Sequence, residues 1–119
     1  MVLLAEDESS LRRLVADFLR SNGYRVVEAE NGEQASEMAK RHEGPLHLLV
    51  TDLVMPRMGG RDLAGQVQVR HPNLPVIFLS GYDSEISQYA ATIEPGTAFL
   101  QKPFSLTDLA RKARDLLDR

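Results

Sequence analysis

Short apolar runs alternate along this chain with longer segments whose apolar residues recur at helical spacing. This alternation is typical of strands joined by helices, which fold into a parallel sheet with helices on both faces. The predicted strands are residues 2–5, 25–29, 46–51, 76–80 and 98–101. Three of them are almost continuously apolar, as expected for strands that are buried on both sides. The sequence therefore predicts an α/β fold, a (βα)5 unit doubly wound around a five-stranded parallel sheet.

The helices are predicted from apolar periodicity and from residues that favour helix ends. In the first helix, which should end near Gly23, the apolar positions are Leu11, Leu14, Val15, Phe18 and Leu19. The next three helices, the first of them capped by Asn31, are expected over residues 32–41, 60–69 and 84–91. The fifth should follow Ser105, where the sequence is similar to a capping box. Its core face is expected to consist of Leu106, Leu109, Ala113, Leu116 and Leu117.

Length and composition exclude several other classes of protein. The 119 residues suffice for one domain, which we expect to span residues 1–119. The chain has no cysteine, which excludes disulfides and thiolate metal sites. Its net charge of −3 gives no general attraction to nucleic acid or to an anionic membrane, and no apolar run is long enough to span a bilayer. We therefore expect a cytoplasmic domain without direct contacts to nucleic acid or membrane.

The predicted strands end in residues that can carry chemistry. In a sheet of this kind ligands bind just beyond the carboxyl ends of the strands, and these ends hold Glu6, Asp7, Asp52, Ser80 and Lys102. Three carboxylates cannot all stay ionised at close quarters without a compensating cation, and a set of oxygen ligands suits Mg2+. Such a site could hold a phosphoryl donor against an aspartate, which would act as a nucleophile and form an aspartyl phosphate. The lysine and the serine would then bind phosphoryl oxygens.

Four segments at these strand ends together resemble the receiver domain of two-component response regulators, and the resemblance covers essentially the whole chain. They are Glu6-Asp7, residues 51–56 with Gly59-Gly60 following, residues 79–82 and residues 99–104. The resemblance implies a flavodoxin-like sheet with strand order 2-1-3-4-5. Residues 51–56 and 79–82 are most similar to the C-terminal receivers of hybrid sensor histidine kinases.

The resemblance also implies which residues form the reactive centre. Asp52 would be the phosphoacceptor. It would hold Mg2+, with Mn2+ as an alternative, together with Asp7, which binds the ion directly, and Glu6, which acts mainly through water. A further metal ligand would be the backbone carbonyl of Val54.

The remaining matches imply a switch. Lys102 and Ser80 would contact the phosphoryl group, and Ser80 would move toward it while Phe99 swings inward. The bond between Lys102 and Pro103 is often cis in this family. The output surface would consist of the fourth helix, the fifth strand and the fifth helix. A phosphodonor built as a four-helix bundle would dock on the first helix through Arg12, Arg13 and Ala16.

Two departures from the commonest receiver pattern border the predicted phosphoryl site. Val54 offers no side-chain amide or acid to orient a water molecule, and Tyr82 lies two residues past the switch hydroxyl. We therefore expect slow self-dephosphorylation, or a partner that removes the phosphoryl group. Gly59-Gly60 does not belong to a phosphate-binding loop, because the G-x-x-x-x-G-K-[ST] pattern is absent. This pair is predicted to permit the turn into the third helix.

The implied function is phosphoryl transfer to Asp52 from a phosphohistidine on a histidine kinase or histidine phosphotransfer protein, or from acetyl phosphate. An isolated receiver would not be an enzyme, although its parent chain could be a kinase anchored in a membrane. A fragment of a hybrid sensor histidine kinase is the favoured interpretation, and a stand-alone regulator that acts by binding proteins is the alternative. The start of the chain directly at its first strand fits both. The domain could also form a weak homodimer.

Two other classes share the predicted architecture. A flavodoxin-like flavin binder should carry a hydroxyl-rich or glycine-rich phosphate loop after the first strand, where this chain has Glu6-Asp7-Glu8. A pseudo-receiver that serves only as an interaction module should lack one of the acids or the lysine, and all of them are present. Both classes are therefore disfavoured.

Overall fold

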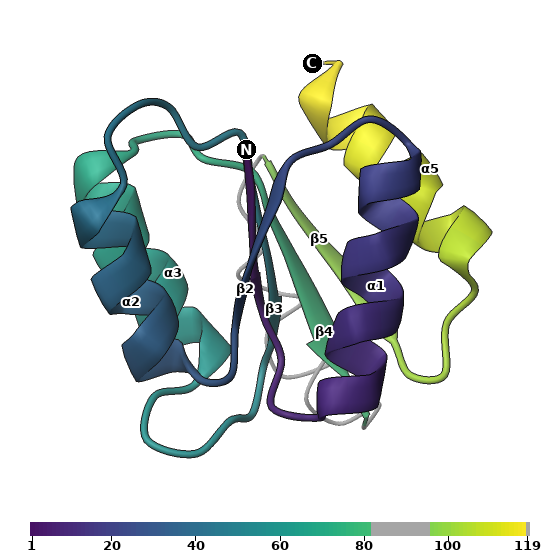
Figure 1. The fold of residues 1–119 in the computed structure, drawn as a ribbon, viewed down its shortest axis with the longest axis horizontal. Coiled ribbons are helices and arrows are strands. Elements are labelled where there is room, and N and C mark those ends of the chain that lie inside the picture. Colours follow the sequence, from purple (N-terminus) through teal and green to yellow (C-terminus); the bar gives the residue numbers. More distant parts are fainter. Residues whose placement is uncertain (82–95, 119) are drawn as a thin grey trace.

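In the computed structural model, which describes residues 1–81 and 96–118, a parallel sheet lies between two layers of helices (Figure 1). Its strands run in the order β2-β1-β3-β4-β5, which confirms the predicted fold class and strand order. They are β1 (Val2–Ala5), β2 (Val26–Ala29), β3 (Leu48–Asp52), β4 (Val76–Ser80) and β5 (Thr97–Gln101). The helices are α1 (Ser9–Ser21), α2 (Gly32–Arg41), α3 (Gly60–Arg70) and α5 (Leu106–Leu117). The helix expected over residues 84–91, and Tyr82, lie outside the described residues.

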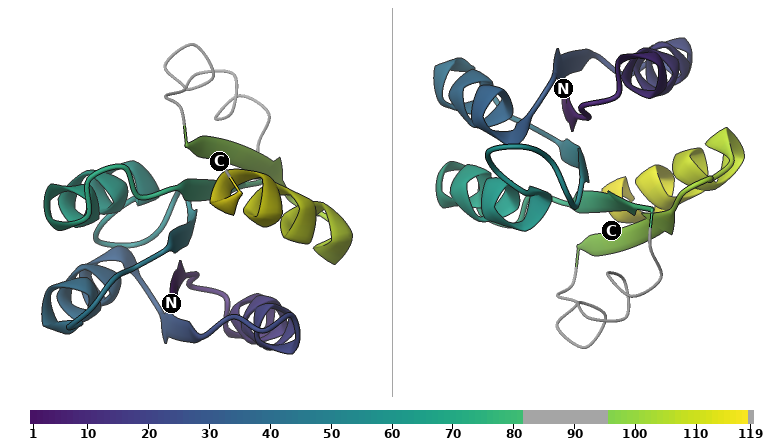
Figure 2. Two further views of the ribbon diagram at one scale, coloured as in Figure 1. Left: turned by 90° about the horizontal axis from the view of Figure 1, so that it is seen from above. Right: turned by 90° about the horizontal axis from the view of Figure 1, so that it is seen from below.

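The two faces of the sheet are covered by different helix pairs. Figure 2 shows α1 and α5 on one side of the strands and α2 and α3 on the other. Alternate residues of a strand point to opposite faces, so that Val2 and Leu4 of β1 pack with α1 and α5, whereas Leu3 and Ala5 pack with α2 and α3. All residues of β1, β3 and β4 are buried. The prediction of a sheet covered on both sides is confirmed.

Local signals in the sequence account for several helix ends. The side chain of Asn31 accepts a hydrogen bond from the Gln34 amide at 2.7 Å, which caps the first turn of α2. The hydroxyl of Ser105 does the same for the Asp108 amide at 3.0 Å, at the start of α5. Past α1, Gly23 has φ +94°, a left-handed conformation that glycine adopts without steric cost.

The face that α1 turns to the core agrees with the predicted one except at Leu14. Leu14 was expected among the apolar positions, but it is 53% exposed, whereas Ala16 is completely buried together with Val15 and Leu19. Leu11 and Phe18, which were also expected, pack against this core with partial burial, so the buried stripe is shifted from Leu14 toward Ala16. A small alanine contributes little to an apolar periodicity, yet it allows close approach of the helix to the sheet.

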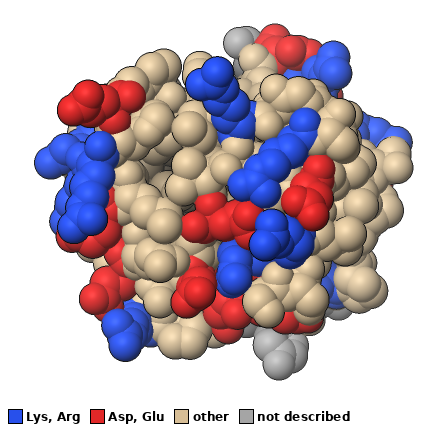
Figure 3. Space-filling view, viewed as in Figure 1, with Lys and Arg blue, Asp and Glu red and all other residues tan. Residues whose placement is uncertain are grey.

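The direction of the strands gathers their carboxyl ends at one edge of the sheet, the lower edge in Figure 1, which we call the carboxyl edge. The chain enters α1, α2 and α3 from this edge, so their N-termini face it. Acidic and basic side chains are interspersed over the face seen in Figure 3. Among the described helices, none combines the length and the apolar character needed to cross a membrane.

Candidate functional site

Strand pairing brings the predicted site residues together at the carboxyl edge. In β1 and β3, Ala5 pairs with Thr51, so that Glu6 and Asp52 are the next residues on neighbouring strands. In β4 and β5, Ser80 pairs with Gln101, and Lys102 follows directly. Four chain segments that are distant in sequence thus end side by side.

Lys102 lies between two of the carboxylates. Its Nζ is 2.9 Å from Oε1 of Glu6, 2.8 Å from Oδ1 of Asp52 and 3.0 Å from Oδ2 of Asp52. Glu6 is completely buried and Asp52 is 6% exposed. We call Glu6, Asp52 and Lys102 the carboxyl-edge network. Its two acids carry more negative charge than the single ammonium compensates.

The buried position of Asp52 affects its pKa. Burial raises the pKa of Asp52 to about 7, against the effect of the hydrogen bond from Lys102, and the negative charge of Glu6 adds to the rise. For Lys102, burial acts to lower the pKa, but its hydrogen bonds to Asp52 and Glu6 outweigh that effect and the pKa is raised. Lys102 therefore stays charged near neutral pH, whereas Asp52 gains or loses its proton there.

A third carboxylate completes a set of ligands suited to a metal ion. Glu6, Asp7 and Asp52 each offer an oxygen atom, and these atoms lie within 4.8 Å of one another. Asp7 is exposed, so an ion can reach the cluster from solvent. An all-oxygen set with a net negative charge fits Mg2+, which retains several water ligands and tolerates few protein ligands. The residues present thus fit the ion that the sequence predicted.

Glu6 is held on every side by hydrogen bonds. Its amide donates to the carbonyl of Ala29 at 3.1 Å, and its Oε2 accepts from the Glu8 amide at 2.9 Å. Its Oε1 accepts from Lys102, and its own carbonyl accepts from Arg12 at 2.9 Å. Both the backbone and the side chain of Glu6, which directly precedes Asp7, are therefore fixed.

The other predicted residues occupy distinct places around this centre. Ser80 is 1% exposed, and its carbonyl accepts a hydrogen bond from the Lys102 amide at 2.6 Å. Val54 is 65% exposed and presents an apolar side chain in the loop after β3. The peptide bond between Lys102 and Pro103 is cis, in agreement with the resemblance.

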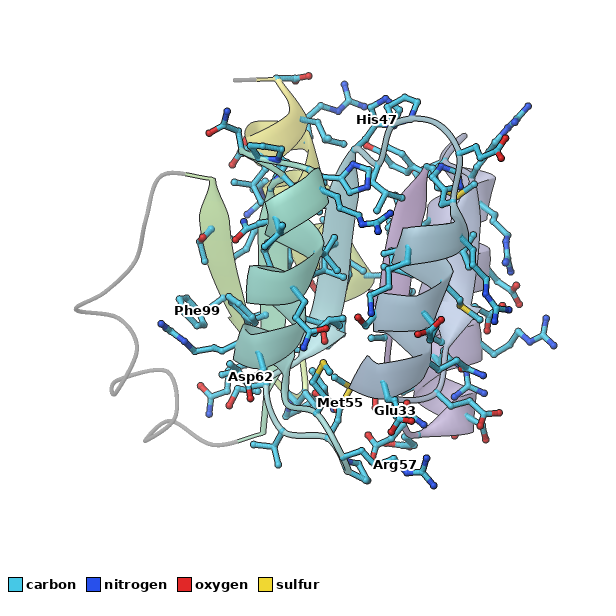
Figure 4. The ribbon with its side chains drawn as sticks, turned by 90° about the vertical axis from the view of Figure 1, so that its left-hand side faces the viewer. Glu33, His47, Met55, Arg57, Asp62 and Phe99 are labelled. Atoms are coloured by element: carbon cyan, nitrogen blue, oxygen red, sulfur yellow. The ribbon has the colours of Figure 1, made fainter. Side chains whose placement is uncertain are left out.

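Phe99 lies in β5, two strands away from β3, which ends in Asp52. It stacks on Phe78 of the neighbouring strand, with ring centroids 5.4 Å apart and an interplanar angle of 28°. This pair belongs to the side of the sheet that α2 and α3 cover (Figure 4). In this structure Phe99 therefore has an aromatic partner that the sequence analysis did not assign.

The loop after β3 is packed tightly against two helices. A Cβ atom on Gly60 would collide with the carbonyl oxygen of Asp52, and one on Gly32 would collide with the carbonyl oxygen of Met58. Gly60 is thus required for close approach, and neither it nor Gly59 has a positive φ. The left-handed residue of this loop is Arg57, with φ +73°. The predicted turn into α3 exists, but its glycines serve packing.

Charged side chains also tie this loop to α2. Arg57 Nη1 lies 3.4 Å from Oε2 of Glu33, in the first turn of α2. Figure 4 shows Met55, Arg57, Glu33 and Asp62 gathered around the ends of α2 and α3 at the carboxyl edge, with His47 at the opposite edge. Within β3, the buried hydroxyl of Thr51 donates to the carbonyl of Asp52 at 3.0 Å and so satisfies that backbone group.

A hollow of about 350 Å3 opens beside Lys102. It is lined by Glu8, Leu11, Gly81, Lys102, Pro103 and Phe104. A donor group could therefore approach the carboxyl-edge network from the side of α1 and the start of α5.

The docking surface expected on α1 needs correction. Ala16 is completely buried and cannot contact a partner, and the Arg12 side chain is only 14% exposed because it binds within the molecule. Of the three expected residues, Arg13 alone is exposed. Sequence reasoning also missed Glu28, a charged residue within the edge strand β2, which pairs with Arg12 and Arg20. A charge inside an otherwise apolar edge strand was the available signal.

Known proteins resemble this chain over nearly its whole length. The profile of the "Response regulator receiver domain" family matches residues 2–114. Sensor kinase CckA of Brucella abortus is 36% identical over 118 residues, which are 99% of this chain but 12% of that protein. Response regulator receiver protein CpdR of Brucella abortus is 34% identical, and the match covers 98% of this chain and 95% of CpdR. The crystal structure of the receiver domain from the hybrid histidine kinase CckA has a TM-score of 0.83 at 34% identity and covers 98% of this chain and 97% of that domain.

Proposed function

Because this chain belongs to the response regulator receiver family of two-component systems, we propose that Asp52 accepts a phosphoryl group from a phosphohistidine of a partner protein. The observation that carries this proposal is the buried Asp52 carboxylate, bound by Lys102 through both oxygens and clustered with Glu6 and Asp7. A carboxylate oxygen of Asp52 attacks phosphorus as the phosphorus–nitrogen bond to the donor imidazole breaks. The leaving imidazole nitrogen keeps the electron pair, and the product is an aspartyl phosphate.

Glu6, Asp7, Asp52 and the backbone carbonyl of Val54 are the residues that would hold Mg2+. The bound ion supplies compensation for the negative charge that collects between the phosphoryl oxygens and the carboxylates. Asp52 must be ionised to act as a nucleophile, and its raised pKa means that a proton leaves as a cation enters. Asp52 would therefore exchange a proton for a metal ion.

Lys102 and Ser80 would bind the transferred group. The ammonium of Lys102 already lies within hydrogen-bond distance of both Asp52 oxygens, so a phosphoryl group attached there would fall within its reach. Ser80 ends the neighbouring strand at the same edge and has a hydroxyl that can donate to a second phosphoryl oxygen. Movement of Ser80 would be accompanied by movement of Phe99, which would first have to leave its stack with Phe78.

We further propose that the domain, taken as residues 1–119, comes from a hybrid sensor histidine kinase. The similarity of residues 51–56 and 79–82 to such receivers and the match to CckA support this assignment. The comparable identity to CpdR, which this chain covers almost completely, keeps a stand-alone regulator as the alternative. In either case the domain would be cytoplasmic, would exchange phosphoryl groups with a histidine kinase or phosphotransfer protein, and would not itself be a turnover enzyme.

The exposed Val54 supports a long-lived phosphorylated state. Its apolar side chain cannot orient a water molecule for attack on the aspartyl phosphate. Decay of the phosphorylated wild-type protein, followed by phosphate release, should therefore take minutes or longer. A half-life of seconds in the isolated domain would contradict this expectation.

Mass spectrometry after incubation with Mg2+ and acetyl phosphate tests the function. We expect one added phosphoryl group in the wild-type protein and none in Asp52→Asn. Asp62→Asn is a matched control, because Asp62 is an exposed aspartate in the first turn of α3 near the same edge. An adduct that persists in Asp52→Asn, or that disappears in Asp62→Asn, would reject Asp52 as the acceptor.

A further inference from the structure

Arg12 is a largely buried arginine that binds two different parts of the molecule. It lies in the first turn of α1, and its side chain is 14% exposed. Its Nη1 donates to the carbonyl of Glu6 at 2.9 Å, and its Nε lies 3.6 Å from Oε1 of Glu28. One guanidinium thus connects α1 to the turn after β1 and to the edge strand β2.

Glu28 is itself held in place from two sides. Arg20 lies two helical turns after Arg12, on the same side of α1, and its Nη1 binds Oε2 of Glu28 at 3.1 Å. Arg20 also donates through Nη2 to the carbonyl of Val26 at 2.9 Å. Each Glu28 oxygen therefore faces a different arginine. We call Arg12, Arg20 and Glu28 the edge-strand network.

The bond from Arg12 to Glu6 determines how the chain leaves β1. The Glu6 carbonyl and the Asp7 amide belong to one planar peptide unit, so a donor that fixes the carbonyl also fixes the direction in which Asp7 begins. The Glu6 amide is already bound by Ala29, and the Glu6 side chain is bound by Glu8 and Lys102. The carbonyl is the last polar group of Glu6, and Arg12 binds it.

We propose that Arg12 is a positioning residue that presents Asp7 to a divalent cation by holding the Glu6–Asp7 peptide. The proposal rests on the proposed function of the carboxyl edge and adds a residue that does not itself contact the ion or the phosphoryl group. The edge-strand network orients the guanidinium, and the guanidinium orients the peptide. Partners of this kind outside the ligand sphere commonly change metal affinity tenfold or more.

The sign of the effect separates positioning from simple electrostatics. Removal of a positive charge close to a cation site should strengthen cation binding if charge alone mattered. Loss of positioning should weaken it. A residue needed only for stability would change unfolding and leave the affinity of the folded protein unchanged.

Mg2+ titration of the folded domain, followed by amide chemical shifts and without a phosphodonor, tests the proposal. We expect Arg12→Met to bind Mg2+ about tenfold more weakly than the wild type. Arg12→Lys keeps the charge but lacks the planar fork that serves two partners, and should bind about threefold more weakly. Arg41→Met is the matched control, because Arg41 is exposed on α2 with only a 3.9 Å ion pair to Glu37, and its affinity should equal that of the wild type.

Unchanged or tighter Mg2+ binding by folded Arg12→Met would overturn the proposal, as would an equal loss in Arg41→Met. If urea unfolding shows that Arg12→Met does not fold, Arg12→Lys decides, and wild-type affinity in that variant overturns the proposal. A different result would reject the proposed function, namely that the wild-type protein gains no phosphoryl group at Asp52. The titration contains no phosphodonor, so its result does not depend on that outcome.

Discussion

The carboxyl-edge network and the edge-strand network meet at Glu6 and have opposite compositions. The first holds two carboxylates and one ammonium, and both acids are buried. The second holds two guanidinium groups and one carboxylate, with side chains between 14% and 40% exposed. The first has surplus negative charge that must be met by protons or cations near neutral pH. The guanidinium groups of the second donate to the backbone carbonyls of Glu6 and Val26. The group that titrates near neutral pH thus belongs to the first network, and the groups that hold the backbone belong to the second.

The largest effect should follow from breaking the carboxyl-edge network at Lys102. Lys102→Met leaves two buried acids without their cation, and we expect the free energy of unfolding at pH 8, in EDTA, to fall by about 3 kcal/mol. At pH 5 the loss should be smaller, because Asp52 is then protonated and the contact with Glu6 accounts for what remains. Urea unfolding at both pH values measures this. Lys40→Met, at an exposed lysine, should change stability little, and a loss in Lys102→Met that is independent of pH would contradict the account.

Asp52→Asn should stabilise the metal-free protein at pH 8 by about 2 kcal/mol. The pKa of Asp52 is about 7 in the folded protein, above its ordinary value of 3.8. The folded state therefore binds more protons than the unfolded state between these values, and stability falls as the pH rises through this window. An asparagine carries no charge that would have to be buried at high pH. The two proteins should therefore differ little in stability at pH 4, where Asp52 is protonated in the folded state. Thermal or urea unfolding at pH 8 measures the difference, with Asp62→Asn as the control. Lower stability of Asp52→Asn than of the wild type would refute the prediction.

Mg2+ binding should be about tenfold tighter at pH 8 than at pH 6, equivalent to about 1.4 kcal/mol. Asp52 must release its proton before it can bind a cation, and its pKa of about 7 lies between these two conditions. Titration at constant ionic strength measures the difference. Equal affinities at both pH values would show that Asp52 does not contribute to the site.

The smallest effect is expected from the outer part of the edge-strand network. Arg20→Met removes the 3.1 Å ion pair to Glu28 and the hydrogen bond to the Val26 carbonyl, both made by an arginine side chain that is 40% exposed. Solvent screening limits the expected loss of unfolding free energy to less than about 1 kcal/mol. The loss should be the same at pH 5 and pH 8 and should shrink at high salt. A strong pH dependence would remove the distinction between the two networks.

Features that depend on local sequence were predicted well. The bounds of β1 and β4 agree with the structure because their apolar runs end at polar residues, and Asn31 marks the start of α2 through its own side chain. The shift of the buried stripe of α1 was not predicted, because a periodicity of large apolar residues favours Leu14 and overlooks the small Ala16.

The structure brings predicted site residues together, but their contacts were not predicted. Strand order and direction suffice to bring Glu6, Asp52 and Lys102 to one edge. Lys102 pairs with Glu6, a residue 96 positions away in the sequence. This contact depends on packing that no local pattern encodes. The bond from Arg12 to a backbone carbonyl was missed for a similar reason, because any residue can provide that carbonyl.

The tight contacts of Gly32 and Gly60 with the loop after β3 bear on how this chain can vary. Neither glycine has a side chain to offer chemistry, yet a single added carbon at either position would meet a backbone carbonyl oxygen, in that loop for Gly32 and at the end of β3 for Gly60. One of these carbonyls belongs to Asp52 itself. In a library of variants randomised at positions 32 and 60, selection for folded protein should return glycine at both. The backbone at Asp52 and in the loop that follows thereby restricts which residue types are tolerated at positions 32 and 60.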